Sequence, residues 1–503
     1  MTHSPMAGVW EELGGDPALL HRVSTVVRPG ALEARLPVRE LARACVGVCA
    51  LAGAELGARR AGLAEVPRVR VDDGAVATAF VSERHLLIDG RAPVTFAPLS
   101  RFWRTADGWV RTHANYPHHR ARLLGALGLA DDATVEDVAG LLAERSASEV
   151  EETVYGAGGL AVALRTAKEW AALEQGIRVA GLPLVERERV DSVRARVLAP
   201  LDGDPLLPAS GVRVLDLTRV IAGPVATRTL ALLGADVLRV DAPQLPEHSD
   251  AHADTGFGKR SATLDLAADR RVLEDLLAAA DVVVTGYRPG SLDRFGLSPE
   301  ALAERRPGLV VAQLSAWGAY GPWGERRGFD SLVQVATGIA AIEGSPERPG
   351  ALPAQALDHG TGYLLAAAVL RALIEQGDEG GTRLVRAALA RTAAWLVNGL
   401  NGLNGLVHDE GAAGSGSAAD SGSAADSGSA ADSGSAADAG SAAGSRSAAD
   451  SGDEPGRWLA ERDSGIGRLR YALPPVSFAG GPADWARPPG PWGTDPARWA
   501  GQA

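Results

Sequence analysis

The stretch GVRVLDLTRVIAGPVATRTLALLGADVLRVDAP, residues 211–243, decides the fold. Val212 to Leu217 is a largely apolar run with β-branched residues, which is typical of a buried parallel strand. Ala226 to Leu233 favours a helix, and Pro224 suits its first turn because proline lacks a backbone N–H. Val237 to Val240 is a second short apolar strand. A strand, a helix and a strand at this spacing predict a right-handed crossover between parallel strands.

The same alternation continues along the chain. We expect strands at residues 261–265, 282–285 and 309–314, and helices at 268–280, 300–304 and 362–376. Such alternation favours an α/β fold with a doubly wound, mostly parallel, Rossmann-like sheet, whose ligands bind at the carboxyl ends of the strands.

A second informative stretch, ALDHGTGYLLAAAVLRALIEQ, covers residues 356–376. It places Asp358 in a glycine-flanked turn, just before an apolar helix expected to begin near Thr361. A carboxylate of ordinary pKa, near 4, is ionised at neutral pH and can attack a carbonyl without an activating base. The alternative is that Asp358 only caps this helix.

Six segments resemble the class III CoA-transferases, the family of formyl-CoA transferase and carnitine CoA-transferase, in the family's order and near its spacing. They are VLDLTRVIAGP, LLGADVLRVDAP, GKRSATLDL, YRPGSLDRFGL, LSAWGAYGPWGERRGFDSLVQVATG and ALDHGTGYLLAAAVLRAL. The resemblance implies that Asp358 is the covalent nucleophile. It would attack an acyl-CoA, form a mixed anhydride and then an enzyme-bound CoA thioester, and pass CoA to an acceptor carboxylate. The flanking Gly360 and Gly362 would let backbone N–H groups stabilise the oxyanion.

The resemblance also implies a site for coenzyme A, which would be a substrate and not a tightly bound cofactor. The residues expected to contact it are Ile221, Ala222, Lys259, Arg260, Arg288 and Gly290. Lys259, Arg260 and Arg288 would hold its phosphates, although solvated loop charges are the alternative for each of them. Binding of NAD is not favoured, because the first turn has a single glycine, Gly223, and no GxGxxG motif.

This sequence departs from the family pattern at several positions. Ile221 stands where a polar residue is common, and Gly286-Tyr287 replaces an asparagine before the RPG element. Arg306-Pro307-Gly308 replaces the usual NPR, and a different loop, PQLPEHSDAHADTG, follows the second strand. None of these changes touches Asp358.

The order of the segments predicts an unusual domain organisation. Residues 1–200 resemble the second half of a class III enzyme and should form a separate α+β domain, while residues 205–400 form the CoA-binding core. Residues 411–453 repeat the unit SGSAAD and read as a disordered acidic linker. Residues 456–503 resemble the family's closing segment, which runs back over the large domain.

Composition favours a cytoplasmic enzyme with two or more domains. The formal net charge of −12 argues against nucleic acid as a partner, and the N-terminal residues do not resemble a signal peptide. We expect no membrane span, a homodimer, and an acyl-CoA and a small carboxylic acid as partners. The two cysteines, Cys45 and Cys49, should be buried thiols. We expect no metal, because the cluster of His113, His118 and His119 matches no standard set of ligands.

Three functions stay open. The first is transfer of CoA from an acyl-CoA to a carboxylic acid. The second is acyl-CoA racemisation, as in the α-methylacyl-CoA racemases of the same superfamily. Those enzymes place a histidine where this chain has Phe329, and phenylalanine cannot carry a proton. The third is a catalytically degenerate CoA-binding protein.

Overall fold

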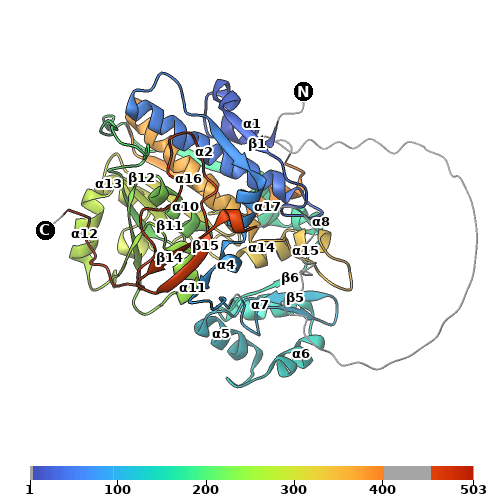
Figure 1. Ribbon diagram of the computed structural model, residues 1–503. Coiled ribbons are helices and arrows are strands. Elements are labelled where there is room, and N and C mark those ends of the chain that lie inside the picture. The colour runs from blue at the N-terminus through green and yellow to red at the C-terminus, as the bar shows by residue number, and fades with distance from the viewer. Residues whose placement is uncertain (1–3, 95, 401–454, 502–503) are drawn as a thin grey trace, which may run out of the picture.

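The computed structural model describes residues 4–94, 96–400 and 455–501. A seven-stranded sheet with the order β10-β9-β8-β11-β12-β13-β7 lies at its centre (Figure 1). In chain order its strands are β7 (Val185–Arg189), β8 (Arg213–Leu217), β9 (Asp236–Asp241), β10 (Arg260–Thr263), β11 (Val282–Thr285), β12 (Val310–Ser315) and β13 (Arg383–Ala388). Strands β8 to β13 are parallel, and β7 pairs antiparallel with β13. The expected α/β fold with a large, mostly parallel sheet is therefore confirmed.

Helices cover both faces of this sheet. Along β11, Val282 and Val284 point into one core and Val283 into another, as the alternation of side chains in a strand requires. The first core includes α10 (Ala222–Leu232), α16 (Ala356–Glu379) and α17 (Leu389–Val397). The second includes α12 (Arg270–Ala279) and α13 (Pro299–Arg305). Burial on both faces explains why the strands read as continuous apolar runs.

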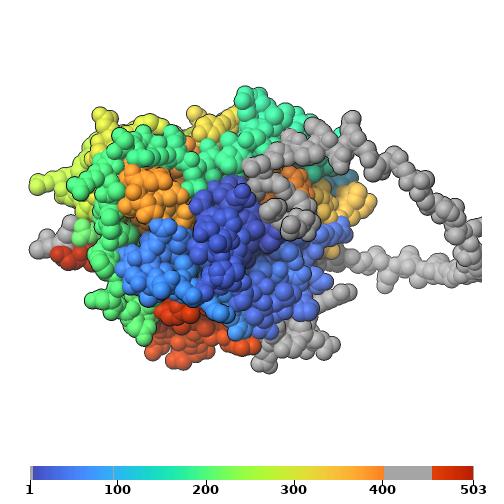
Figure 2. Space-filling model, turned by 90° about the horizontal axis from the view of Figure 1, so that it is seen from above, coloured from blue at the N-terminus to red at the C-terminus, as the bar shows by residue number. Residues whose placement is uncertain are grey.

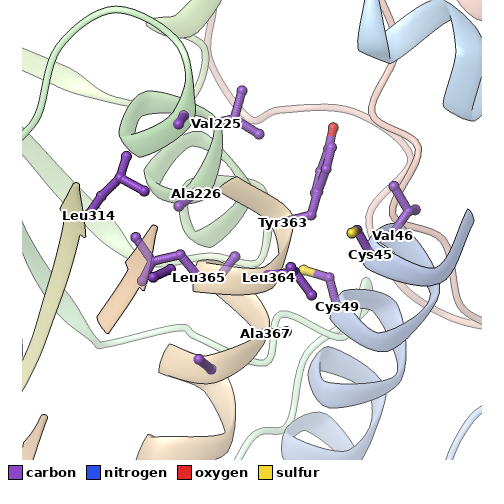
Figure 3. Close-up of a cluster of buried hydrophobic side chains, with 14 of the residues drawn as sticks. Cys45, Val46, Cys49, Val225, Ala226, Leu314, Tyr363, Leu364, Leu365 and Ala367 are labelled. Carbon is purple, nitrogen blue, oxygen red and sulfur yellow. The ribbon is translucent and has the colours of Figure 1, made fainter. Parts of the chain in front are cut away.

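Helix α16 packs between α10 and a long helix from the N-terminal region, α2 (Val38–Ala61) (Figure 3). Leu364 and Leu365 of α16 lie in this core together with the buried free thiols Cys45 and Cys49 of α2. The buried cysteines were expected from the sequence. Helix α2 is long and apolar enough to cross a membrane, but 94% of its most apolar window is buried inside the protein, as in a core helix.

A smaller unit with its own core lies beside the large sheet (Figure 1). Its three-stranded sheet has the order β4-β5-β6, and all its pairings are antiparallel. The elements are β4 (Phe102–Arg104), β5 (Trp109–Thr112), β6 (Ala161–Ala163), α5 (Pro117–Leu127), α6 (Val135–Ala143) and α7 (Ala147–Gly156).

The N-terminal and C-terminal segments lie against each other and against the large domain, where Figure 2 shows blue, orange and red residues in contact. The N-terminal segment contributes α1 (Pro5–Glu12), η1 (Pro17–Arg22), β1 (Val23–Val26), β2 (Val69–Asp72), α3 (Asp73–Phe80), α4 (Ser82–His85) and β3 (Leu87–Ile88). Strand β3 pairs with β15 (Gly467–Ala472), which pairs with β14 (Leu459–Ser464) after η3 (Pro455–Trp458). Further on, Trp492 Nε1 donates to Asp241 Oδ2 at 2.9 Å, and Trp499 Nε1 donates to the Leu276 carbonyl at 3.0 Å. The last residues described therefore run back over the large domain.

The division expected near residue 200 is not a division of the packed core. Strand β7 of the first 200 residues completes the large sheet, and α2 shares a core with α16. The sequence of β7, VERER, is mostly charged and resembles a solvated segment. Such a sequence can form this strand because an edge strand exposes one side to water. The expected linker at 411–453 lies outside the described residues.

The remaining elements connect these parts. They are α8 (Ala167–Ala172), α9 (Glu174–Ala180), α11 (Ser249–Thr255), η2 (Asp293–Phe295), α14 (Asp330–Ala336) and α15 (Ile339–Ile342).

Candidate functional site

The site is at the carboxyl edge of the large sheet, where the strand order reverses between β8 and β11. Loops that leave neighbouring parallel strands in opposite directions open a crevice for ligands at such a point. The loop after β8 leads to Ile221 and Ala222, and the loop after β11 holds Arg288 and Gly290. The structure therefore brings these four predicted residues to the same edge.

The loop after β8 is held in a strained conformation. Val220 has φ 70°, in the left-handed region that β-branched residues avoid. Its N–H donates to Glu247 Oε2 at 3.1 Å. Strain at a residue that precedes a predicted ligand contact is typical of functional loops.

Asp358 lies in the first turn of α16, whose N-terminus faces this edge. The helix begins at Ala356, so the expected glycine turn is in fact helical. Asp358 is only 7% exposed, and its carboxylate accepts no hydrogen bond within the described chain. A buried acid without partners contributes little to stability and needs another explanation.

A second acid, Asp330 at the start of α14, caps α16. Its Oδ2 accepts the N–H groups of Leu357 and Asp358, both at 2.9 Å, and its Oδ1 accepts from Gln334 Nε2. The helix has no side-chain cap of its own at Gln355. The alternative that Asp358 serves as the cap is therefore wrong, because Asp330 satisfies these N–H groups.

The ionisation of Asp358 also differs from the expectation of an ordinary pKa. Burial, followed by the charges of Asp330 and Glu83, raises the pKa of Asp358 well above its usual value. Burial also raises the pKa of Asp330, but its three hydrogen bonds and the nearby His359 oppose that shift. Of the coupled pair, Asp358 is the acid that keeps its proton to the higher pH.

Glu83 comes from α4, in the N-terminal region, and reaches the first turn of α16. Its Oε2 is 3.6 Å from Nε2 of His359, which is fully buried and stacks on Phe80 with ring centroids 5.3 Å apart. Burial raises the pKa of Glu83, but the interaction with nearby His359 outweighs it, so the pKa is lowered. The buried His359 and the half-buried Glu83 therefore lie beside Asp358.

Gly360 and Gly362 allow helices to approach closely. A Cβ on Gly362 would lie 2.5 Å from the Ala222 carbonyl oxygen, and one on Gly360 would lie 2.9 Å from Leu41 Cδ2. Both follow the first turn of α16, where backbone N–H groups bond to carbonyls four residues back. Their position gives no support to the expected oxyanion role, which stays a prediction.

Two of the three predicted phosphate-binding cations are engaged in ion pairs. Lys259 is 3% exposed, and its Nζ is 3.0 Å from both Asp216 Oδ2 and the Pro224 carbonyl. Burial lowers its pKa to about 8, although Asp216 opposes the shift. Arg260 bonds Asp236 at 2.7 Å, on the side of the amino ends of the strands. These contacts indicate structural roles for both side chains.

Arg288 is exposed and lies in the loop that follows β11 at the carboxyl edge. After burial, the charges of Arg122 and Arg288 lower the pKa of Arg327, so Arg327 is within electrostatic reach of both. No ion pair involves them among the residues described. We call Arg122, Arg288 and Arg327 the basic cluster.

The histidine cluster packs against Phe329, the residue before Asp330. The rings of His113 and Phe329 are stacked, with centroids 3.6 Å apart and an angle of 9° between planes. Burial lowers the pKa of His113 to about 3 and that of His119 to about 2, so both are neutral at physiological pH. No group of side chains suited to a metal ion occurs in the described ranges.

Sequence reasoning missed several members of the site. Asp330 and His359 lie inside segments that were quoted for the family resemblance, so a polar residue at the start of each apolar helix was a usable signal. Glu83 and the basic-cluster residue Arg122 gave no signal, because they come from the N-terminal region and reach the site only through the tertiary fold.

The comparisons with known proteins agree with the resemblance. Residues 209–425 match the model of CoA-transferase family III. An acetyl-coenzyme A transferase, nodX, of Hypoxylon pulicicidum is 37% identical over 202 residues, which are 38% of this chain and 34% of that protein. A probable fatty acyl-CoA transferase, Rv3272, of Mycobacterium tuberculosis is 36% identical over 38% of this chain and 53% of its own length. A crystal structure of Rv3272 gives a TM-score of 0.37, covering 39% of this chain and 57% of that one.

A formyl-CoA:oxalate CoA-transferase of Streptomyces coelicolor is 33% identical over 36% of this chain and 47% of that protein. This chain thus spans about a third to a half of the length of these relatives. The resemblance to the class III CoA-transferases is confirmed for residues 209–425.

Proposed function

We propose that this protein is a CoA-transferase that moves CoA from an acyl-CoA to a carboxylic acid, with Asp358 as the covalent nucleophile. The observation that carries the proposal is the buried Asp358 carboxylate, which has no hydrogen bond in the described chain and lies at the carboxyl edge of the sheet. It lies within the segment that matches the family. The names of the relatives support this class of reaction.

In the proposed reaction an oxygen of ionised Asp358 attacks the thioester carbonyl and CoA leaves as the thiolate, giving a mixed anhydride. The thiolate then attacks the carbonyl carbon of Asp358 and releases the donor acid. This leaves a thioester between Asp358 and CoA. The acceptor carboxylate attacks that thioester and expels the CoA thiolate, which gives a second mixed anhydride with Asp358. The thiolate then attacks the carbonyl carbon of the acceptor, forming the new acyl-CoA and releasing Asp358 as a free carboxylate.

The raised pKa of Asp358 gives this reaction a pH dependence. Only the ionised form attacks, so the rate rises as the pH increases through the pKa of Asp358. A buried carboxylate that is poorly solvated is also a stronger nucleophile once ionised, because it lacks hydrogen bonds that would have to break.

For the phosphates of CoA we propose the basic cluster, with Arg288 as the member predicted from the sequence. Its three guanidinium groups have no ion-pair partner in the described residues, and phosphate oxygens are suitable partners for them. When the parallel strands β8 to β13 are numbered 1 to 6, their order in the sheet is 3-2-1-4-5-6. This order supports the doubly wound, Rossmann-like interpretation of this site. A homodimer and a cytoplasmic location stay predictions.

Racemisation requires two groups that exchange protons on opposite sides of the substrate carbon. Phe329 occupies the position before Asp330, and His113 stacks flat against it. This arrangement favours transfer over racemisation.

The test compares the wild-type protein with Asp358→Asn, in an assay of thiol release and CoA transfer with a panel of acyl-CoAs. Asn keeps the size of the side chain and removes the attacking oxygen anion. We expect transfer to be lost, while the variant still binds CoA and still shows the thermal unfolding transition of a folded protein. An active Asp358→Asn protein, checked for deamidation, would contradict the mechanism. A wild type that binds CoA but transfers nothing would favour the degenerate CoA-binding protein.

A further inference from the structure

Arg111 is a half-buried cation, with a buried Nε atom, that the proposed reaction has not yet used. It lies on β5, two residues before His113, so the side chains of both point to the same face. His113 stacks on Phe329, next to Asp330, and α14, which begins at Asp330, packs against β5. Arg111 therefore lies on the face of the smaller unit that is turned towards Asp330.

Aromatic rings surround the guanidinium group of Arg111. Its Cζ lies 4.8 Å from the ring centroid of Phe102, its cross-strand neighbour, and 5.5 Å from that of Phe96. Burial lowers the pKa of Arg111 to about 10, and the charge of Asp330 acts in the opposite direction. Within the described chain Arg111 forms no ion pair, and its Nε is buried without a hydrogen-bond partner.

Three fully buried guanidinium groups in the described chain are paired with acids. Arg228 pairs with Asp254, Arg239 with Asp241, and Arg371 with Glu55. A buried charge without a partner is costly, and a carboxylate matches the planar fork of a guanidinium group. Asp330 does not fill this role, because its oxygens accept hydrogen bonds from Leu357, Asp358 and Gln334.

We propose that Arg111 binds a carboxylate of the acid substrate, a role that rests on the proposed CoA-transferase function. Two acids, Asp330 and Glu83, lie beside the first turn of α16, and their negative charges repel an anionic acceptor that approaches the Asp358 thioester. A cation must draw the acceptor in against this field, and Arg111 is a cation without a partner that faces it. The ring of Phe102 covers part of the guanidinium group and lowers the local dielectric, which strengthens the charge pair.

The test uses Arg111→Met, which keeps the length of the side chain and removes the fork. Arg104→Met is the matched control, because Arg104 is an exposed arginine of neighbouring β4 that lies 5.2 Å over the ring of Trp109. Rates are measured with the best acyl-CoA donor and with succinate or benzoate as acceptor. We expect Arg111→Met to raise the KM for the acid at least about tenfold, with the KM for acyl-CoA unchanged. Arg104→Met should change neither constant.

A binding measurement separates this proposal from the proposed function. Succinate or benzoate should raise the unfolding temperature of the wild type, and Arg111→Met should lose this shift, whether or not any transfer is detected. Arg111→Lys, which keeps the charge without the fork, should bind the acid with intermediate strength and guards against misfolding of the Met variant. A folded variant at position 111 with unchanged acid KM and unchanged acid-induced shift overturns the proposal. So does a wild type that neither acid stabilises.

Discussion

Replacing Asp330 by Asn changes one atom of the site and has consequences that can be worked out from the structure. Asp330 Oδ2 accepts two backbone N–H groups of α16, at 2.9 Å each. Oδ1 accepts from Gln334 Nε2, and the orientation of Gln334 is fixed because its Oε1 accepts the Leu352 N–H at 2.9 Å. An Asn side chain can keep its oxygen towards α16, but its NH₂ group then faces the NH₂ group of Gln334.

The stability change has two parts. Hydrogen bonds to a charged group contribute about 1.5–3 kcal/mol and neutral ones about 0.5–1.5 kcal/mol, so two weakened bonds lose about 2–3 kcal/mol. The mismatched donors at Gln334 add about 1 kcal/mol, while relief of repulsion with Asp358 offsets a part of the sum. We expect Asp330→Asn to lower the free energy of unfolding by about 2–4 kcal/mol, measured by urea unfolding.

The same change shifts the activity profile in a defined direction. The charge of Asp330 helps to raise the pKa of Asp358, so its removal lowers that pKa. The acid limb of the rate of CoA transfer, which reports ionisation of the nucleophile, should move to lower pH. Rates of wild type and Asp330→Asn between about pH 5 and pH 9 test this. A folded variant with an unmoved limb, or with a stability equal to that of the wild type, would refute the reasoning.

Three further predictions follow from the same contacts. The pKa of Asp358 is raised in the folded protein, so its contribution to stability is lost as the pH rises from the ordinary pKa through the raised pKa. Asp358→Asn should therefore become more stable than the wild type as the pH increases. If the free energies of unfolding of the two proteins changed in parallel with pH, the raised pKa would be excluded. Glu83→Gln removes one of the charges that raise the pKa of Asp358 and the partner of His359, so the acid limb of the rate should again move to lower pH, whereas the exposed control Glu461→Gln should leave it in place. Arg288→Ala should weaken CoA binding by about 1.5–3 kcal/mol with little change in stability. Lys259→Ala breaks the buried pair with Asp216 and should cost about 3–5 kcal/mol of stability. Calorimetric titration measures CoA binding and thermal unfolding measures stability, and a stable Lys259→Ala protein that binds CoA poorly would show that Lys259 binds the phosphates.

Local sequence was sufficient for most of the central sheet. The expected strand at 282–285 coincides with β11, and the strand expected at 309–314 differs from β12 by one residue at each end. These strands are buried on both faces, so apolar β-branched runs identify them. The start of α16 was placed too late, because Gly360 and Gly362 were interpreted as a turn when they serve the close packing of helices.

The electrostatics of the site could not be predicted from local sequence. Lys259 reads as a free cation until the fold brings it to Asp216, and Asp358 reads as an ordinary acid until the fold adds Asp330 and Glu83. Both effects depend on burial and on residues far apart in the chain. Family resemblance identified Asp358, but only the tertiary structure shows which neighbours set its ionisation.

The central claim is that Asp358 forms a covalent bond with its substrate, and mass spectrometry of the intact protein tests it most directly. The protein is incubated with a panel of acyl-CoAs, with and without hydroxylamine, and the modified peptide is then sequenced. Without hydroxylamine we predict an adduct of the mass expected for CoA on Asp358. With hydroxylamine, which displaces CoA, we predict a hydroxamate on Asp358, and both modifications should be missing from Asp358→Asn. An active wild type that carries no adduct on Asp358, or an adduct that persists in the variant, would contradict the claim.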